Sequence, residues 1–175
     1  VICLALASGG NFLADSNFAD PEKKTLRIPF SSVGANSIPQ LQFPSLDPSL
    51  NFFAFLVYRK TYGYSSVHWF AYNIPREDIL SGDYRSKIRT YPSLKNDSGS
   101  RSYTGPVSHS GQGSAKYNFE LYGSERKLPM VAVTGMTSPN DDILGYRRIM
   151  QFLVASRAKF VTNLIVNFSK KLIVL

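Results

Sequence analysis

The sequence has few of the residues that cross-link a chain. Its 175 residues include one cysteine, Cys3, and two histidines, His68 and His109. One cysteine cannot form an internal disulfide, and this set is too small for a structural zinc site, which takes four ligands. We therefore expect no metal and no cofactor, and packing must supply the stability.

Long apolar runs are also missing. The opening uncharged apolar run, Ile2 to Ala7, is far below the ~20 residues that a membrane-spanning helix needs. Hydrophobic residues make up 43% of the chain, which is too much for a disordered segment. A single domain over residues 1–175 is the expectation. The opening letters V-I-C-L-A-L-A contain no basic residue and favour a strand over a signal peptide, so we expect a cytoplasmic protein without a transmembrane segment.

Acidic residues are outnumbered in the second part of the chain. Residues 81–175 hold fourteen Lys or Arg and six acids, so the whole net charge of +8 lies there. Between residues 84 and 103, cations alternate with tyrosines: Tyr84, Arg85, Lys87, Arg89, Tyr91, Lys95, Arg101 and Tyr103. This mixture suits phosphate contact and base stacking, so a basic single-stranded nucleic-acid binder is one alternative. A solvated loop explains the pattern better, and nucleic acid is not the expected partner.

Proline and glycine punctuate the chain up to about residue 135 and exclude long helices there. Between them lie short runs rich in aromatic and β-branched residues, which predict strands. The runs are Thr25 to Pro29, Gln40 to Phe43, Phe52 to Tyr58, Val67 to Ile74, Tyr117 to Tyr122 and Met130 to Val133. The run from Phe52 is apolar throughout and predicts a central strand. In the run from Tyr117, apolar and polar residues alternate, which predicts a strand with one face exposed to solvent. The fold class is mostly β, a β-sandwich.

The C-terminal part changes character. Asp141 and Asp142 suit the start of a helix that continues to about residue 157. Its expected buried positions follow three-to-four spacing: Leu144, Ile149, Met150, Leu153 and Val154. Residues 160–167 alternate and are rich in β-branched residues, which favours a last strand. One amphipathic helix is thus expected to pack on the sheet.

Two stretches resemble the phosphatidylethanolamine-binding protein family, which includes the Raf kinase inhibitor protein and its bacterial relatives. The first is F-F-A-F-L-V-Y at residues 52–58, a loop, and then V-H-W-F-A-Y-N-I-P at residues 67–75. It is similar to the family's hydrophobic strand, D-P-D-A-P loop, H-W pair and strand ending in N-I-P. The second stretch, from Tyr103 to Tyr122, is similar to the family's Y-x-G-x-G-P-P-x-G-x-x-x-H-R-Y block and the strand after it. The chain resembles a divergent member of the bacterial-type branch.

The resemblance implies a Greek-key β-sandwich with a small anion pocket, known in the family to accept phosphate or phosphorylated head groups without established catalysis. On the matching positions, His68, Gly105 with Pro106, and Tyr117 are expected to line that pocket. A non-enzymatic binding protein is therefore expected, with a small anionic ligand as partner and a protein partner, which it would regulate, as a second expectation.

The chain also departs from the family pattern. The D-P-D-A-P position reads R-K-T-Y-G at residues 59–63, so the carboxylate is missing and two cations, Arg59 and Lys60, stand in its loop. The H-R-Y histidine is Ala115, and His109 is expected to substitute for it. Without the family carboxylate, His68 loses the partner that favours its charged form. We therefore expect phosphate to bind at least as well as phosphoethanolamine.

A weak hydrolase that uses the same pocket is the enzyme alternative. Ser65, Ser66, His68 and Asp78 supply the residue types of a catalytic triad. No serine, however, lies in the G-x-S-x-G pattern that would make a nucleophile elbow. Binding without catalysis remains the expectation.

Overall fold

The structure is a computed structural model, and it describes residues 13–15, 25–29, 38, 40–43, 46–61, 63–105, 114–130 and 145–169. The strands are β1 (Leu13–Asp15), β2 (Thr25–Pro29), β3 (Gln40–Gln42), β4 (Phe52–Thr61), β5 (Tyr64–Pro75), β6 (Ser93–Leu94), β7 (Ser114–Ser124) and β8 (Lys159–Ser169). The helices are α1 (Arg76–Ser81), the 3₁₀ turn η2 (Asp83–Arg85) and α2 (Tyr146–Ala155).

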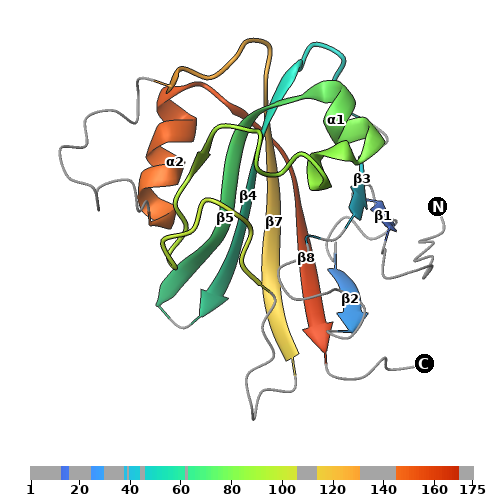
Figure 1. Ribbon diagram of the computed structural model, residues 1–175, viewed down its shortest axis with the longest axis vertical. Helices are drawn as coiled ribbons and strands as arrows, with labels where there is room; N and C mark the ends of the chain where they lie inside the picture. The colour runs from blue at the N-terminus through green and yellow to red at the C-terminus, as the bar shows by residue number, and fades with distance from the viewer. Residues whose placement is uncertain are drawn as a thin grey trace.

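Six strands form one large sheet in the order β2-β8-β7-β4-β5-β6. All its neighbours are antiparallel except β2 and β8, which run parallel. β1 and β3 form a separate parallel pair. α2 lies on one side of the large sheet, and α1 and β3 lie on the other (Figure 1). The mostly β fold with one C-terminal helix is confirmed, although the second sheet has two strands in the part of the chain that the structure describes.

The two faces of the large sheet carry separate hydrophobic cores. On one face, β4, β5 and β7 contribute Phe55, Trp69 and Phe119, covered by residues of β3, α1 and η2. On the other face, Leu56 and Phe70 pack against Phe152 and its neighbours on α2. β4 lies between β5 and β7 and is buried on both faces, as its unbroken apolar run predicts.

Two bulges in β5 set which face its residues occupy. Val57 pairs with Trp69, but the next residue, Tyr58, pairs with Val67. His68 is therefore an extra residue in β5 and stays on the face of Trp69. A second register shift lies near Asn73, whose φ is +59°. Bulges of this kind depend on how the strands pair in the fold and have no signature in the apolar pattern.

Several predicted elements agree with the structure. Thr25–Pro29 is a strand with the expected bounds, strands cover the runs that begin at Phe52, Val67 and Tyr117, and the strand at Gln40 ends one residue before Phe43. The last strand is Lys159–Ser169, and Trp69 is fully buried. The expected opening strand, residues 131–133 of another and helix residues 141–144 lie outside the described residues.

Other expectations are corrected. The helix ends at Ala155, and Phe152 is buried in place of Val154, which is 73% exposed because it lies off the 149–152–153 face. The alternating run in β7 has no wet face, because α2 covers Glu120 and Tyr122. Met130 belongs to a 3₁₀ turn and not to a strand. α1 was not predicted, since its six residues are too few to show a period. Within the described ranges, no helix has both the length and the apolar character to cross a membrane.

Candidate functional site

Three of the residues expected to form the pocket meet on the Trp69 face of the sheet. The rings of His68 in β5 and Tyr117 in β7 lie edge to face, with their centroids 4.7 Å apart. Gly105 packs against both, since a Cβ at this position would lie 3.1 Å from Nδ1 of His68 and 3.3 Å from Cε1 of Tyr117. Gly105 has a φ of +132°, which L side chains rarely adopt. The close approach and the backbone angle together require glycine.

Asn96 holds the segment that carries Gly105. It is fully buried, and its Nδ2 donates hydrogen bonds to the carbonyl of His68, to the carbonyl of Ser102 and to Oγ1 of Thr104, at 2.8–3.0 Å. Its Oδ1 accepts from the backbone N–H groups of Ser98 and Ser100 and from the Ser98 hydroxyl. The backbone N–H of Thr104 also donates to the carbonyl of His68. One buried amide thus fastens residues 98–104 to β5.

His68 is held in one tautomer. Its Nδ1 is hydrogen-bonded to the backbone carbonyl of Thr104, and because a carbonyl only accepts, Nδ1 carries the proton. Nε2 of the neutral ring is then an acceptor, and it donates only when His68 is protonated.

The surroundings of His68 favour its neutral form. Burial lowers the pKa of His68 below its ordinary value, and the charge of Arg59 lowers it further. The hydrogen bond to Thr104 and the charge of Asp97 act in the opposite direction but do not outweigh burial. The expectation that His68 is poorly supported as a cation agrees with this direction, although burial, and not a missing carboxylate alone, is the main cause.

Arg59 and Lys60, the two cations of the expected loop, lie on opposite faces of the sheet. β4 continues through Arg59 and Lys60 to Thr61, so the first three residues of the D-P-D-A-P position are strand and not loop. Arg59 pairs with Tyr117 and its charge acts on His68, which places it with the cluster. Lys60 alternates to the opposite face, and there it lines a cavity with Tyr146. Arg59 thus lies on the face of His68, whereas Lys60 lies on the opposite face.

Two residues at this site were missed in the sequence. Asn96 and Asp97 follow β6, and Oδ2 of Asp97 accepts hydrogen bonds from the Tyr64 hydroxyl at 2.6 Å and the Val67 N–H at 2.9 Å. Asp97 thereby supplies a carboxylate near His68 from a different loop. Asn-Asp-Ser-Gly-Ser is typical of side chain-capped turns, which is the one local signal that points to it. Pro106 and His109 lie outside the described residues.

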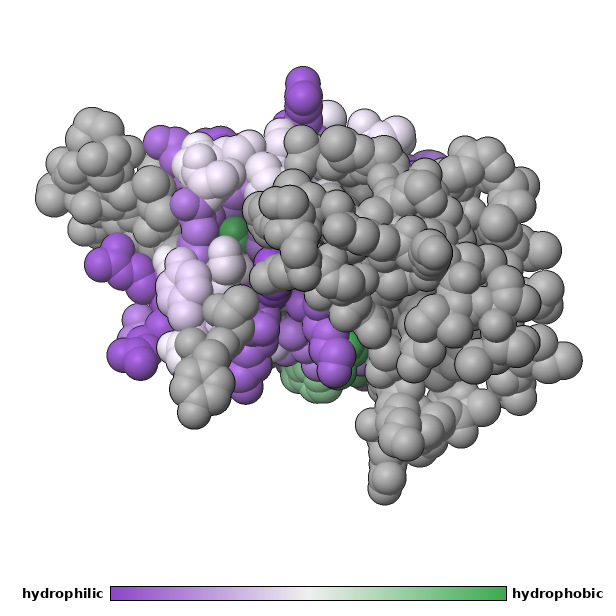
Figure 2. Space-filling model, turned by 90° about the horizontal axis from the view of Figure 1, so that it is seen from below, coloured by the Kyte–Doolittle hydropathy of each residue, from purple (hydrophilic) through white to green (hydrophobic). Residues whose placement is uncertain are grey.

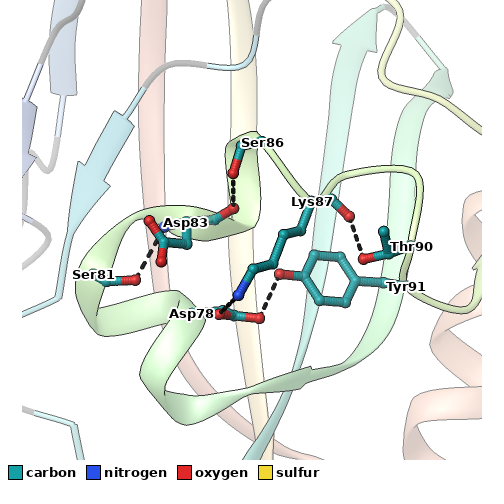
Figure 3. Close-up of polar contacts among 7 residues, drawn as sticks. All are labelled: Asp78, Ser81, Asp83, Ser86, Lys87, Thr90 and Tyr91. Atoms are coloured by element: carbon teal, nitrogen blue, oxygen red, sulfur yellow. Dashed lines mark hydrogen bonds and ion pairs between the residues drawn. The ribbon is translucent and has the colours of Figure 1, made fainter.

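Asp78 is not available to a catalytic triad. Its carboxylate accepts hydrogen bonds from Nζ of Lys87 at 2.6 Å and from the Tyr91 hydroxyl at 2.7 Å (Figure 3). These bonds tie α1 to the segment after η2. His68 instead bonds a backbone carbonyl. The Ser-His-Asp combination behind the hydrolase alternative is therefore not assembled.

The tyrosines between residues 84 and 103 point inward. Tyr84, Tyr91 and Tyr103 are all buried in the core that contains Trp69, so their rings cannot stack on bases. Their spacing reflects packing, and the nucleic-acid alternative loses the observation on which it depended. In the described parts of the chain, no three His, Cys, Asp or Glu side chains are placed to hold a metal ion.

The chain matches a known protein family at the level of sequence. The family model described as phosphatidylethanolamine-binding protein matches residues 17–161. No curated protein sequence matches the chain.

Three solved structures have a similar fold. A phosphatidylethanolamine-binding protein from Plasmodium vivax has a TM-score of 0.54 at 14% identity, with 94% of this chain and 82% of that chain covered. E. coli YbcL, described as a member of the mammalian PEBP family, has a TM-score of 0.51 at 17% identity, with 97% of each chain covered. A carboxypeptidase Y inhibitor, solved with its cognate proteinase, has a TM-score of 0.50 at 13% identity, with 90% and 81% covered. At these identities the likeness concerns the fold.

Proposed function

The chain belongs to the phosphatidylethanolamine-binding protein family, and from that premise we propose that it is a non-enzymatic binding protein that takes a small anion at His68, Arg59, Tyr117 and Gly105. The observation that carries the proposal is the contact of Gly105 with both rings, beside the side chain of Arg59. The guanidinium supplies positive charge, and its planar donors suit a phosphate or carboxylate group. Pro106 and His109 remain proposed as further parts of the wall.

The protonation of His68 links anion binding to pH. Neutral His68 offers an acceptor at Nε2 and repels the lone pairs of an anion, whereas the protonated ring donates a charge-assisted hydrogen bond. An anion therefore raises the pKa of His68 on binding, and affinity rises as pH falls toward the lowered pKa of the free protein. This coupling distinguishes a site at His68 from general attraction to the net charge of +8.

The preference between ligands follows from the charges. The family's acidic loop is replaced by a strand that carries Arg59, so an ethanolamine ammonium meets a like charge instead of a carboxylate. Asp97 does not replace that partner fully, because its Oδ2 already accepts two hydrogen bonds. We therefore keep the expectation that phosphate binds at least as well as phosphoethanolamine.

Calorimetry with both ligands tests the proposal. At a pH low enough to protonate His68, wild type should bind phosphate, and His68→Gln and Arg59→Gln should each raise its Kd about tenfold, the effect of losing one charge-assisted contact of ~1.4 kcal/mol. Lys116→Gln is the matched control, since Lys116 precedes Tyr117 in β7 but is exposed. A clear preference for phosphoethanolamine, or binding indifferent to His68, would show that the site is misplaced. Release of nitrophenol from 4-nitrophenyl phosphate would favour the hydrolase alternative.

A protein partner is the second candidate function. One observation favours it: a protein of similar fold is a carboxypeptidase Y inhibitor, solved with its cognate proteinase. Inhibition of purified carboxypeptidase Y by this chain, measured against a peptide substrate, tests the idea directly. Inhibition that survives His68→Gln would place the protein-binding surface away from the anion site.

A further inference from the structure

A cavity lies on the opposite side of the large sheet from His68. It has a volume of about 510 Å³ and lies between the β4–β5 hairpin and the first residues of α2. Its walls include Lys60, Tyr64, Ser65, Gly145, Tyr146 and Arg147. Figure 2 views the molecule from below, and there the described surface is mostly hydrophilic with small hydrophobic patches. The volume falls within the range of small-molecule sites.

The register of the hairpin explains why these side chains meet. Lys60 and Ser65 are opposite each other in β4 and β5, so both project to one face. Tyr58 lies two residues before Lys60 on that face, and its ring packs against Tyr146 at 4.6 Å between centroids. This contact fixes the start of α2 against the hairpin and leaves the cavity beside it.

Two cations line the cavity. Lys60 and Arg147 are exposed, and neither forms an ion pair with any carboxylate in the part of the chain that the structure describes. The nearby Glu120 lies behind the tyrosines, where it accepts hydrogen bonds from Tyr58 at 2.8 Å and Tyr122 at 2.7 Å and is buried. The cavity walls therefore carry two cations, while Glu120 is shielded.

An aromatic ring, that of Tyr146, forms another wall. Tyr146 is held from below by Tyr58. Rings fixed in this way offer flat apolar surface at little cost in conformational entropy.

We propose that this cavity is a second binding site, whose ligand is an aromatic ring that carries a phosphate. Lys60 and Arg147 bind the phosphate, and the ring of Tyr146 packs against the aromatic group. This chemistry has two sources, a nucleoside monophosphate and a phosphotyrosine side chain. The site is separate from the one proposed at His68, because Arg59 and Lys60 alternate to opposite faces of β4.

Titration calorimetry with phenyl phosphate tests the proposal, with inorganic phosphate and benzyl alcohol as probes that lack the ring or the charge. Wild type should bind phenyl phosphate at least tenfold more tightly than either. Lys60→Gln combined with Arg147→Gln should raise the Kd of phenyl phosphate at least tenfold. Arg148→Gln is the matched control, since Arg148 is the next residue of α2, is exposed and does not line the cavity, and it should change the Kd less than twofold.

Two further variants decide the location. Gly145→Leu should block binding without strain, because the φ of Gly145 is −64° and a Cβ there meets no atom within 4 Å. His68→Gln should leave phenyl phosphate binding intact, and this result separates the present proposal from the one for His68. Equal loss in Arg148→Gln, loss in His68→Gln, or phenyl phosphate binding no tighter than inorganic phosphate would overturn it. Adenosine 5′-monophosphate and N-acetyl-phosphotyrosine amide, titrated in parallel, identify the source by the lower Kd.

Discussion

The side-chain amide of Asn96 donates a hydrogen bond of 2.9 Å to the backbone carbonyl of His68. The two residues lie in different strand-and-loop segments, and this bond joins the bulged part of β5 to the loop that presents Thr104 and Gly105. Because a buried amide without partners is costly, Asn96 serves both stability and the geometry of the candidate site.

We predict that Asn96→Ala is strongly destabilising. The change removes a fully buried side chain with partners on both amide atoms and leaves several backbone groups unpaired, so the free energy of unfolding should fall by about 2–4 kcal/mol. Urea denaturation followed by circular dichroism measures the loss. Asn51→Ala is the control, since exposed Asn51 gives one side-chain bond to the Glu125 carbonyl and should cost less than about 1 kcal/mol. Equal costs would contradict the structural role of Asn96.

Gly105→Ala should both destabilise the protein and displace His68. A Cβ would lie 3.1 Å from Nδ1 of His68 at a φ of +132°. Gly99→Ala is the matched control, because Gly99 has a φ of +79° but its Cβ would meet no atom within 4 Å. We expect about 1 kcal/mol for Gly99→Ala, from backbone strain, and at least about 2 kcal/mol for Gly105→Ala. Equal losses in thermal unfolding would show that the contact with His68 is not tight.

His68 should titrate below its ordinary pKa. Burial disfavours the imidazolium, so the unfolded state binds more protons than the folded state between the lowered pKa and about 6.5. The free energy of unfolding should therefore rise with pH through this window, and His68→Gln should flatten the slope. Proton NMR of the imidazole Cε1–H measures the pKa, with His109→Gln to assign the two histidines. A pKa above 6.5 would contradict the prediction.

Bound sulfate should raise the pKa of His68 back toward its ordinary value. Sulfate keeps its charge over this pH range, so any pH dependence of its affinity reports on the protein. We expect its Kd to rise as pH increases through the pKa of His68, and His68→Gln to remove the dependence. A Kd of sulfate that does not vary with pH in the wild type would place the bound anion away from His68.

Asp78 should contribute to stability against acid. Burial alone raises the pKa of Asp78, but the hydrogen bonds from Lys87 and Tyr91 outweigh it and hold the pKa below the ordinary value of 3.8. This contribution is present above the unfolded pKa and is lost as pH falls through the folded pKa. Asp78→Asn should therefore lower the urea midpoint at pH 7 more than at pH 3. Asp83→Asn, at an exposed residue of η2, should show little difference between the two pH values.

The sequence by itself determined the strands and much of their placement. The run from Phe52 to Tyr58 is apolar at every position, and such a run is stable only when both faces are covered, which makes β4 central. The order of the matched motifs also placed His68, Gly105 and Tyr117 together, although they are far apart in the chain. These features depend on side-chain chemistry and spacing, which are read directly from the letters.

Only the tertiary structure decided which face each residue occupies. β4 extends three residues beyond Tyr58, and because the side-chain period of a strand is two, Arg59 and Lys60 lie on different faces. The bulge in β5 places His68 on the same face as Trp69. Elements distant in sequence also bury Glu120 and Asn96. α2 covers Glu120, and β5 forms a hydrogen bond with Asn96. Local propensity does not encode such contacts, because their free energy arises between segments that the chain brings together only when it folds.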